Sequence, residues 1–142
     1  MEFRNCYESD IDGCAKILSE AYAQPPYNEK WELDHAIAYL RRFYKIDPAL
    51  CFVAEDGAEV IGAIFAYSYP WHGGENCYIQ EIFVSPGSQG LSIGKGLINK
   101  LSASKSGSST WLVANENAKA IDFYKSLGFS NNGPYKFFYG PV

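Results

Sequence analysis

Apolar residues in the first third of the chain recur every three or four positions, which is the spacing of one face of an α-helix. After residues 2–7, which we predict to form a short first strand, this spacing appears twice, at residues 11–22 and at about residues 29–45. Ser9 or Asp10 can cap the first of these helices. A Pro-Pro segment separates the two patterns and an Asp-Pro pair follows the second, so we expect two amphipathic helices with a break between them.

Three apolar runs follow, at residues 50–54, 60–69 and 76–84. They are rich in β-branched and aromatic residues and are bounded by turn residues, which predicts strands. Glu-Asp-Gly at residues 55–57 forms a hairpin turn between the first two runs. A second turn, at residues 70–74, contains Pro and Gly-Gly. We therefore expect consecutive antiparallel hairpins in the middle of the chain.

The last third of the chain mixes helical spacing with short strand-like segments. We predict a helix at residues 94–101, a strand at 110–113, a helix at 117–126 and closing strands at 128–130 and 135–139. Hairpins followed by a β-α-β-like half are typical of an α/β domain. The prediction is one domain over residues 1–142: a mixed, mostly antiparallel central sheet of six to seven strands with helices on both faces.

The loop at residues 89–94 joins a predicted strand to a helix and is rich in small residues. Such a loop can bind phosphate, because unpaired amide N–H groups and the helix dipole point at one spot. It does not match a P-loop, since Gln89 stands at the first glycine and Gly96 at the Ser/Thr position. It does not match a dinucleotide-binding fingerprint either, since Asn99 stands where the third glycine would be.

The same loop resembles the coenzyme A loop of the GNAT superfamily of acyl-CoA-dependent N-acyltransferases, whose pattern is [QR]-x-x-G-x-[GA] between a strand and a helix. The pattern is carried here by Gln89, Gly90, Leu91, Ser92, Ile93 and Gly94. One position departs from it, because Ser92 replaces the middle glycine. A second stretch, residues 111–129, is similar to the superfamily's C-terminal unit, with A-x-x-F-Y on a helix followed by L-G-F.

This resemblance implies a GNAT-like fold and acetyl-CoA as co-substrate. It assigns the pyrophosphate to the loop and to Lys95, and the pantetheine arm to the preceding strand and to the start of a later helix. The implied coenzyme A contacts outside the loop are Ile82, Phe83, Val84, Lys95 and Asn117. An amide N–H near Phe83 would polarise the acyl carbonyl. Asn117 as a helix N-cap is an equally good interpretation.

Two residues take catalytic roles by the same resemblance. Glu81 would act as a general base through a water, or would only bind a cationic substrate; both interpretations stay open. Strand alternation places Glu81 and Phe83 on one face and Gln80 and Ile82 on the other. Tyr124 would protonate the departing thiolate, although transfer from a phenol to a thiolate is uphill by about 2 kcal/mol unless the phenol pKa is lowered. A core tyrosine is the alternative.

The acceptor would lie against aromatic residues of the first two helices and the turn at residues 70–74. We expect Tyr27, Trp31, Trp71 and Glu81 to bind it, and aromatic rings beside carboxylates suit a cationic amine. His72 is interpreted as a solvated turn residue.

Composition narrows the function further. A net charge of −4 argues against nucleic-acid binding. The N-terminus lacks a signal-peptide pattern and no apolar run approaches 18 residues, so we expect a cytoplasmic protein without a membrane span. The four cysteines are scattered and far from both histidines, which predicts no metal site and no disulfide framework. A homodimer is left open.

The sequence thus predicts an N-acetyltransferase that transfers the acetyl group of acetyl-CoA to a primary amine of a small cationic acceptor, by direct attack in a ternary complex. Two alternatives remain. One is a peptide N-terminal or lysine acetyltransferase, and the other is a non-catalytic acyl-CoA-binding regulatory module.

Overall fold

A computed structural model describes the chain except for residues 91, 106, 108 and 117–118. Its centre is a five-stranded sheet with strand order β1-β2-β3-β4-β5. Neighbouring strands are antiparallel except β4 and β5, which run parallel. The strands are β1 (Glu2–Asn5), β2 (Cys51–Asp56), β3 (Glu59–Trp71), β4 (Gly74–Val84) and β5 (Ser109–Trp111).

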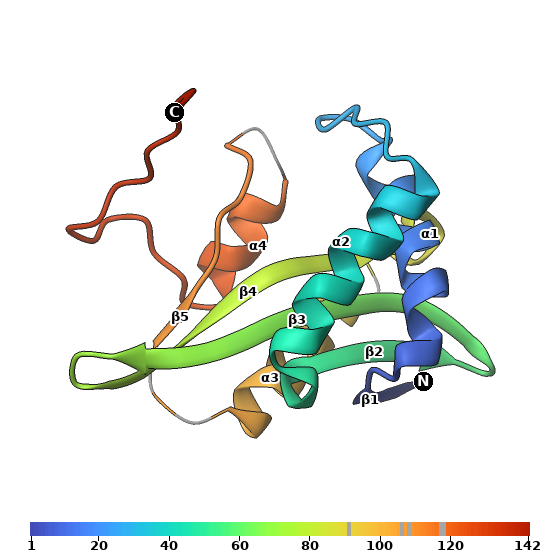
Figure 1. Cartoon of the computed structure of the whole chain (residues 1–142), viewed down its shortest axis with the longest axis horizontal. Helices are drawn as coiled ribbons and strands as arrows, with labels where there is room; N and C mark the ends of the chain where they lie inside the picture. The colour runs from blue at the N-terminus through green and yellow to red at the C-terminus, as the bar shows by residue number, and fades with distance from the viewer. Residues whose placement is uncertain (91, 106, 108, 117–118) are drawn as a thin grey trace.

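Helices cover both faces of this sheet (Figure 1). The α-helices are α1 (Ile11–Tyr22), α2 (Leu33–Ile46), α3 (Ile93–Ser104) and α4 (Ala120–Ser126). Three short 3₁₀ turns lie at η1 (Glu8–Asp10), η2 (Pro48–Leu50) and η3 (Pro86–Ser88). Helices α1 and α2 pack on one face, and α3 packs on the other with α4 beside it.

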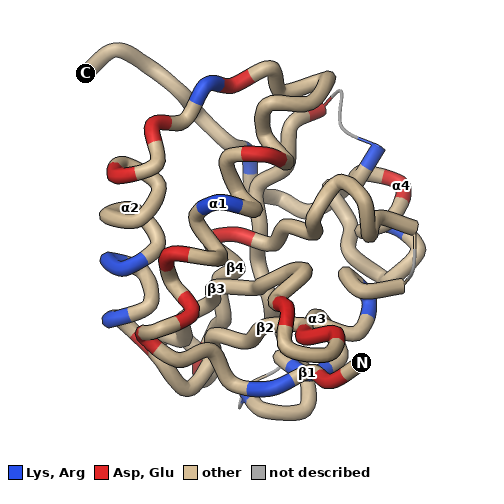
Figure 2. The backbone as a smooth tube through the Cα atoms, turned by 90° about the vertical axis from the view of Figure 1, so that its right-hand side faces the viewer, with Lys and Arg blue, Asp and Glu red and all other residues tan. Residues whose placement is uncertain are grey.

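Charged side chains are dispersed over the molecule. Lys and Arg, like Asp and Glu, occur on several helices and strands and do not gather on one side (Figure 2). In the part of the chain that the structure describes, no helix is both long and apolar enough to cross a membrane. The same residues contain no group of three or more His, Cys, Asp and Glu side chains placed to hold a metal ion.

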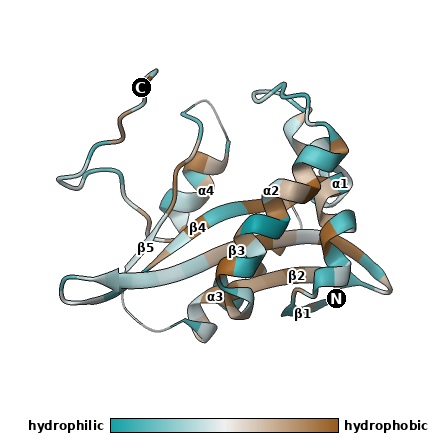
Figure 3. Cartoon of the chain, viewed as in Figure 1, coloured by the Kyte–Doolittle hydropathy of each residue, from teal (hydrophilic) through white to brown (hydrophobic). Residues whose placement is uncertain are grey.

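The sheet separates two apolar clusters because successive strand residues point to opposite faces. Val53 and Phe65 pack with α1 and α2, whereas Phe52 and Ile64 pack with α3. All four side chains are almost fully buried. Burial of each contributes about 1.5–3 kcal/mol, so these central strands anchor the fold. The apolar residues lie on the strands and inner helix faces, while the outer end of the β3–β4 hairpin is more polar (Figure 3).

The predicted count of six to seven strands is wrong. Residues 128–130 and 135–139, expected as closing strands, are irregular. Phe137 and Phe138 are adjacent and 72% and 87% exposed. Adjacent aromatic residues do not provide the two-residue period that lets one strand face bury against a core. Aromatic residues without this period are therefore not sufficient to predict a strand at residues 135–139.

The second helix begins at Leu33, four residues later than about residue 29 where the prediction starts it. Asn28 adopts a left-handed conformation with φ of 50°, which a helix cannot include. The segment from Gln24 to Glu32 therefore connects α1 to α2 without helix; its first part forms turns, and residues 24–27 line the cleft described below.

Gly107 holds the start of β5 against β4. A Cβ at this position would clash with the backbone carbonyl oxygen of Glu75, and its φ of +84° also favours glycine. Gly57, in the β2–β3 turn, has a similar φ of +65° but nothing within 4 Å of its would-be Cβ. An alanine would be strained at either position because of the positive φ, but only at position 107 would it also clash with a neighbouring strand.

We expect Gly107→Ala to lower the free energy of unfolding by about 2–4 kcal/mol, because overpacking against backbone adds to the strain. The matched variant Gly57→Ala should lose only about 1 kcal/mol. Urea denaturation measures both. Equal losses in the two variants would show that Gly107 makes no close contact with β4.

Candidate active site

The two parallel strands separate soon after they begin to pair. Among the described residues, β4 pairs with β5 at three positions, from Asn76 to Tyr78. Beyond them, within the described residues, β4 has no strand partner on this side. The gap widens into a cleft of about 1120 Å³, which is slightly above the usual size of ligand pockets.

The cleft collects residues from four parts of the chain. They are the end of α1 and the connection after it, the end of β4 with the following loop, the segment after β5, and α4. The residues from β4 onward are Ile82, Phe83, Val84, Ser88, Gln89, Gly90, Ser92, Ile93, Gly94, Lys95, Val113, Ala114, Asn115, Lys119, Ala120, Phe123, Tyr124, Ser126 and Leu127. Among all described lining residues the charged ones are Lys95 and Lys119, so the cleft suits an anion.

Ladder geometry decides which β4 amides face the cleft. The Ser85 N–H donates to the Ile61 carbonyl at 2.8 Å, which makes this a hydrogen-bonded pair of the β3–β4 ladder. In an antiparallel ladder every second residue is in such a pair, so Phe83 also directs its N–H toward β3. Ile82 and Val84 direct theirs into the cleft. The expected amide near Phe83 is therefore that of Ile82 or Val84.

The loop before α3 has the backbone that a glycine-rich loop requires. Gly90 has φ of +83° and Ser92 has φ of +63°, both left-handed. A non-glycine residue in this region costs about 1–2 kcal/mol, which explains why the middle position of the pattern is usually glycine. The Ser92 side chain makes no capping hydrogen bond, so it does not occupy the first N–H groups of α3. Leu91 lies outside the described residues.

Gly94 connects this loop to α4. A Cβ on Gly94 would lie 3.2 Å from Cζ of Phe123, so the missing side chain lets α4 approach the start of α3. Gln89 supports the other end of the loop, where its Nε2 donates to the Val84 carbonyl at 3.3 Å. The loop, β4 and α4 are thus held together around the cleft.

Tyr124 lies on α4, next to Phe123, and lines the cleft. Its ring also packs against Phe129, with centroids 5.9 Å apart. Burial raises the pKa of Tyr124, with smaller contributions from Tyr27 and Glu81 in the same direction. A lowered phenol pKa, one of the two possibilities left by the sequence, has no support. Asn117 lies outside the described residues.

Glu81 is held by two phenols. Its Oε1 accepts a hydrogen bond from the Tyr22 hydroxyl at 2.6 Å, and its Oε2 accepts one from the Tyr39 hydroxyl at 2.7 Å. Burial raises the pKa of Glu81, and the two hydrogen bonds oppose this shift without cancelling it. A second, smaller cavity of about 70 Å³ lies beside Glu81, and Tyr22, Ile82 and Tyr124 line both cavities.

A β-bulge changes the faces expected for β4. The register shifts between Phe65 and Ala66, which lie opposite Glu81 and Ile79, so Gln80 is an extra residue. Its Nε2 donates to the Tyr39 hydroxyl at 3.0 Å, so Gln80 and Glu81 both reach the same phenol. The expectation that Gln80 shares a face with Ile82 is wrong, because a bulge re-aims a side chain.

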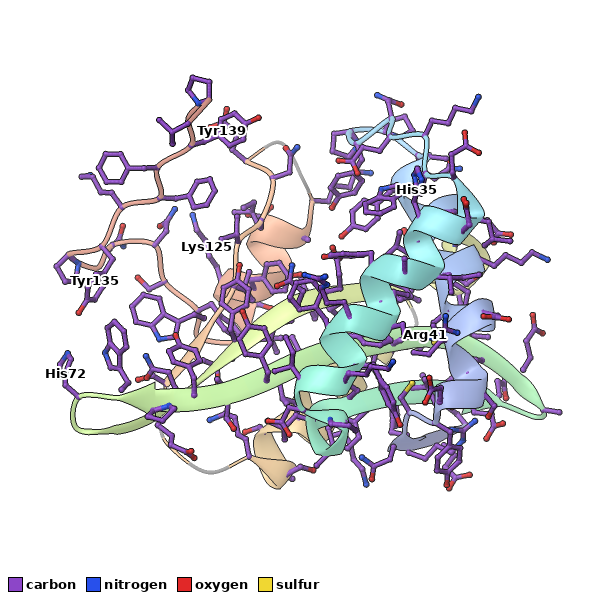
Figure 4. The ribbon with its side chains drawn as sticks, in the orientation of Figure 1. His35, Arg41, His72, Lys125, Tyr135 and Tyr139 are labelled. Atoms are coloured by element: carbon purple, nitrogen blue, oxygen red, sulfur yellow. The ribbon has the colours of Figure 1, made fainter. Side chains whose placement is uncertain are left out.

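The predicted acceptor residues are not all close to Glu81. Tyr27 stacks edge-on against Tyr22, with centroids 4.7 Å apart, and Trp31 lies 5.2 Å from the Tyr39 ring. Trp71 lies six residues along β3 from Phe65, the partner of Glu81, or about 20 Å away. His72 is exposed at the outer end of the same hairpin (Figure 4).

Sequence reasoning did not predict that Lys119 lines the cleft or that Tyr22 and Tyr39 bind Glu81. Lys119 lies just before α4 and lines the cleft, and its position close to the A-x-x-F-Y segment was the available signal. Tyr22 and Tyr39 hold Glu81, but they come from helices whose orientation on the sheet no local pattern specifies.

Comparison with known proteins agrees with this geometry. A model of the Acetyltransferase (GNAT) family matches residues 14–129. An uncharacterised N-acetyltransferase of Methanocaldococcus jannaschii is 34% identical over 139 residues, covering 89% of this chain. The chain spans 59% of the length of that relative. The thialysine N-epsilon-acetyltransferase of Bos taurus is 34% identical over 138 residues, covering 88% of this chain and 81% of the bovine protein.

Solved structures share the fold at low sequence identity. A ribosomal-protein-alanine N-acetyltransferase from Brucella melitensis biovar Abortus has a TM-score of 0.75 at 19% identity, covering 99% of this chain and all of that one. A transcriptional regulator from Bacillus halodurans has a TM-score of 0.76 at 18% identity, covering 98% and 99%. Taken with the family match, the cleft and the loop, these findings lead to one conclusion: the chain belongs to the GNAT family of acetyltransferases.

Proposed function

We propose that the protein transfers the acetyl group of acetyl-CoA to a primary amine of a small cationic acceptor, by direct attack in a ternary complex. One observation carries the proposal. The separation of β5 from β4 opens a cleft that has the phosphate-type loop at one side and Tyr124 and the Glu81 cavity at the other.

The residues of the cleft fit acetyl-CoA as substrate. The first N–H groups of α3 and the left-handed backbone at Gly90 can bind the pyrophosphate, with Lys95 and Lys119 as cations. The amides of Ile82 and Val84 can bond the pantetheine arm. One of them would donate to the acetyl carbonyl, and this contact strengthens as negative charge develops on the oxygen.

Tyr124 is proposed to stabilise the leaving thiolate. Its raised pKa keeps the phenol protonated at neutral pH and makes full proton transfer to a thiolate uphill by more than about 2 kcal/mol. Hydrogen bonding from the hydroxyl to the sulfur as charge develops is therefore its main contribution. The thiolate would take its proton from water once it has left the cleft.

The acceptor is proposed to enter beside Tyr27 and Trp31, next to the Glu81 carboxylate. Aromatic rings and a carboxylate together attract an ammonium group. The bovine relative is named for an acceptor of this kind, thialysine. Trp71 could contact only the distant end of a long acceptor.

One observation favours the alternative of a peptide or protein lysine acceptor. Aromatic rings continue from Phe43 to Tyr67, stacked with centroids 6.2 Å apart, and then to Tyr69 and Trp71. This row leads from the Tyr39 neighbourhood to the outer end of the hairpin, as a binding site for an extended chain would. A non-catalytic acyl-CoA-binding module is the third possibility, and measurement of turnover excludes it or supports it.

Gly90→Val should weaken acetyl-CoA binding at least tenfold, because a β-branched residue is strongly disfavoured at φ of +83° and the loop must rearrange. Gly87→Val is the matched control. It lies three residues earlier, outside the left-handed region, with nothing within 4 Å of its would-be Cβ, and it does not line the cleft. Titration calorimetry measures both. Equal affinities in the two variants would argue against the loop as the pyrophosphate site.

Tyr124→Phe should reduce kcat by about 10²-fold while leaving acetyl-CoA affinity nearly unchanged, because only the hydroxyl is lost. The assay follows thiol release from acetyl-CoA with thialysine as acceptor. Full activity in this variant would remove Tyr124 from the mechanism. Absence of turnover in the unmodified protein, with thialysine, polyamines and lysine peptides alike, would contradict the proposed function itself.

A further inference from the structure

Tyr22 connects the cleft with Glu81. Its hydroxyl donates to Glu81 Oε1 at 2.6 Å, and Tyr22 is a lining residue of both the large cleft and the small cavity. Glu81 lines only the small cavity. Of these two residues, only Tyr22 is therefore in reach of an amine that attacks a thioester in the cleft.

Tyr39 binds the same carboxylate but has a different environment. Its hydroxyl donates to Glu81 Oε2 at 2.7 Å and accepts from Gln80 Nε2 at 3.0 Å, and Tyr39 lines neither cavity. The Tyr22 oxygen, by contrast, accepts no hydrogen bond from any residue that the structure describes. It is left with a lone pair that a substrate N–H can use.

We propose that Tyr22 is a catalytic residue that relays the proton of the acceptor ammonium to Glu81. The ammonium N–H bond breaks and its proton moves to the Tyr22 oxygen. At the same time the Tyr22 O–H bond breaks and that proton moves to Glu81 Oε1. The acceptor becomes a neutral amine, Tyr22 remains a neutral phenol and Glu81 becomes a carboxylic acid. This inference rests on the proposed function and adds a residue to it.

The electrostatic environment suits a relay in which no phenolate forms. Burial and the Glu81 charge raise the pKa of Tyr22, which disfavours the phenolate. The titratable groups that act on Tyr22 are Glu81 on β4, Tyr27 after α1 and Tyr124 on α4. Burial also raises the pKa of Glu81 and so makes it a better proton acceptor. The hydrogen bonds from Tyr22 and Tyr39 act in the opposite direction, and Glu29 adds to the rise.

The test compares Tyr22→Phe with Tyr39→Phe, because each removes one phenol donor from Glu81 and keeps the ring. The pH dependence of kcat is measured with thialysine and saturating acetyl-CoA. At pH 7.5 Tyr22→Phe should lose about 10²-fold in kcat, and the loss should shrink toward pH 10, where free amine of pKa about 10.4 is abundant. A merely structural role would give a loss independent of pH.

Tyr39→Phe should keep its maximal kcat within about threefold. Its acidic limb should move to higher pH, because a hydrogen bond that lowers the pKa of Glu81 is lost. Similar kcat values for Tyr22→Phe and Tyr39→Phe across the pH range would overturn the relay.

A double variant tests whether the two relay residues act as one unit. Glu81→Gln should lower kcat about as much as Tyr22→Phe, and the double variant should be no slower than either single variant. Losses that multiply in the double variant would contradict a shared proton path. Thermal melts of each variant exclude loss of folding as the cause.

Absence of turnover in the unmodified protein would overturn both the relay and the proposed function. Normal turnover of Tyr22→Phe would overturn the relay alone.

Discussion

The early separation of β5 from β4 is the constraint on which the site depends. Three pairs near Asn76 hold the parallel strands together, and the rest of β4 then presents every second amide to a cleft instead of to a neighbouring strand. A backbone amide excluded from a ladder needs another partner or solvent. The edge of β4 therefore lines the cleft and supplies a row of backbone N–H donors to it. The loop before α3 and helix α4 line the rest of the cleft.

Two contacts complete this arrangement. Gly94 lacks a side chain where the Phe123 ring approaches, so α4 packs against the start of α3 and carries Tyr124 to the cleft. On the other face of β4, the bulge at Gln80 places Glu81 beneath two phenols. Desolvating a carboxylate costs several kcal/mol, and hydrogen bonds to a charged group each recover about 1.5–3 kcal/mol. The phenols thus keep a carboxylate inside the protein.

The fold was largely predictable from sequence and the site only in part. Hydrophobic spacing located the hairpins and α1, α3 and α4, and the loop pattern around Gly90 indicated the family. The prediction of closing strands was wrong: Phe137 and Phe138 are aromatic, but they are exposed and do not lie in a strand. The bulge at Gln80 and the phenols on Glu81 could not be predicted, since they depend on how α1 and α2 lie across the sheet. Strand alternation is a local rule and does not contain that information.

Amide hydrogen exchange on β4, followed by NMR with and without acetyl-CoA, tests the central claim most directly. If the cleft-facing edge of β4 binds the pantetheine arm, acetyl-CoA should slow exchange of the Ile82 and Val84 amides. The Phe83 amide, which points toward β3 between them, should change little and serves as an internal control. Unchanged exchange at Ile82 and Val84 in the presence of bound acetyl-CoA would contradict the account.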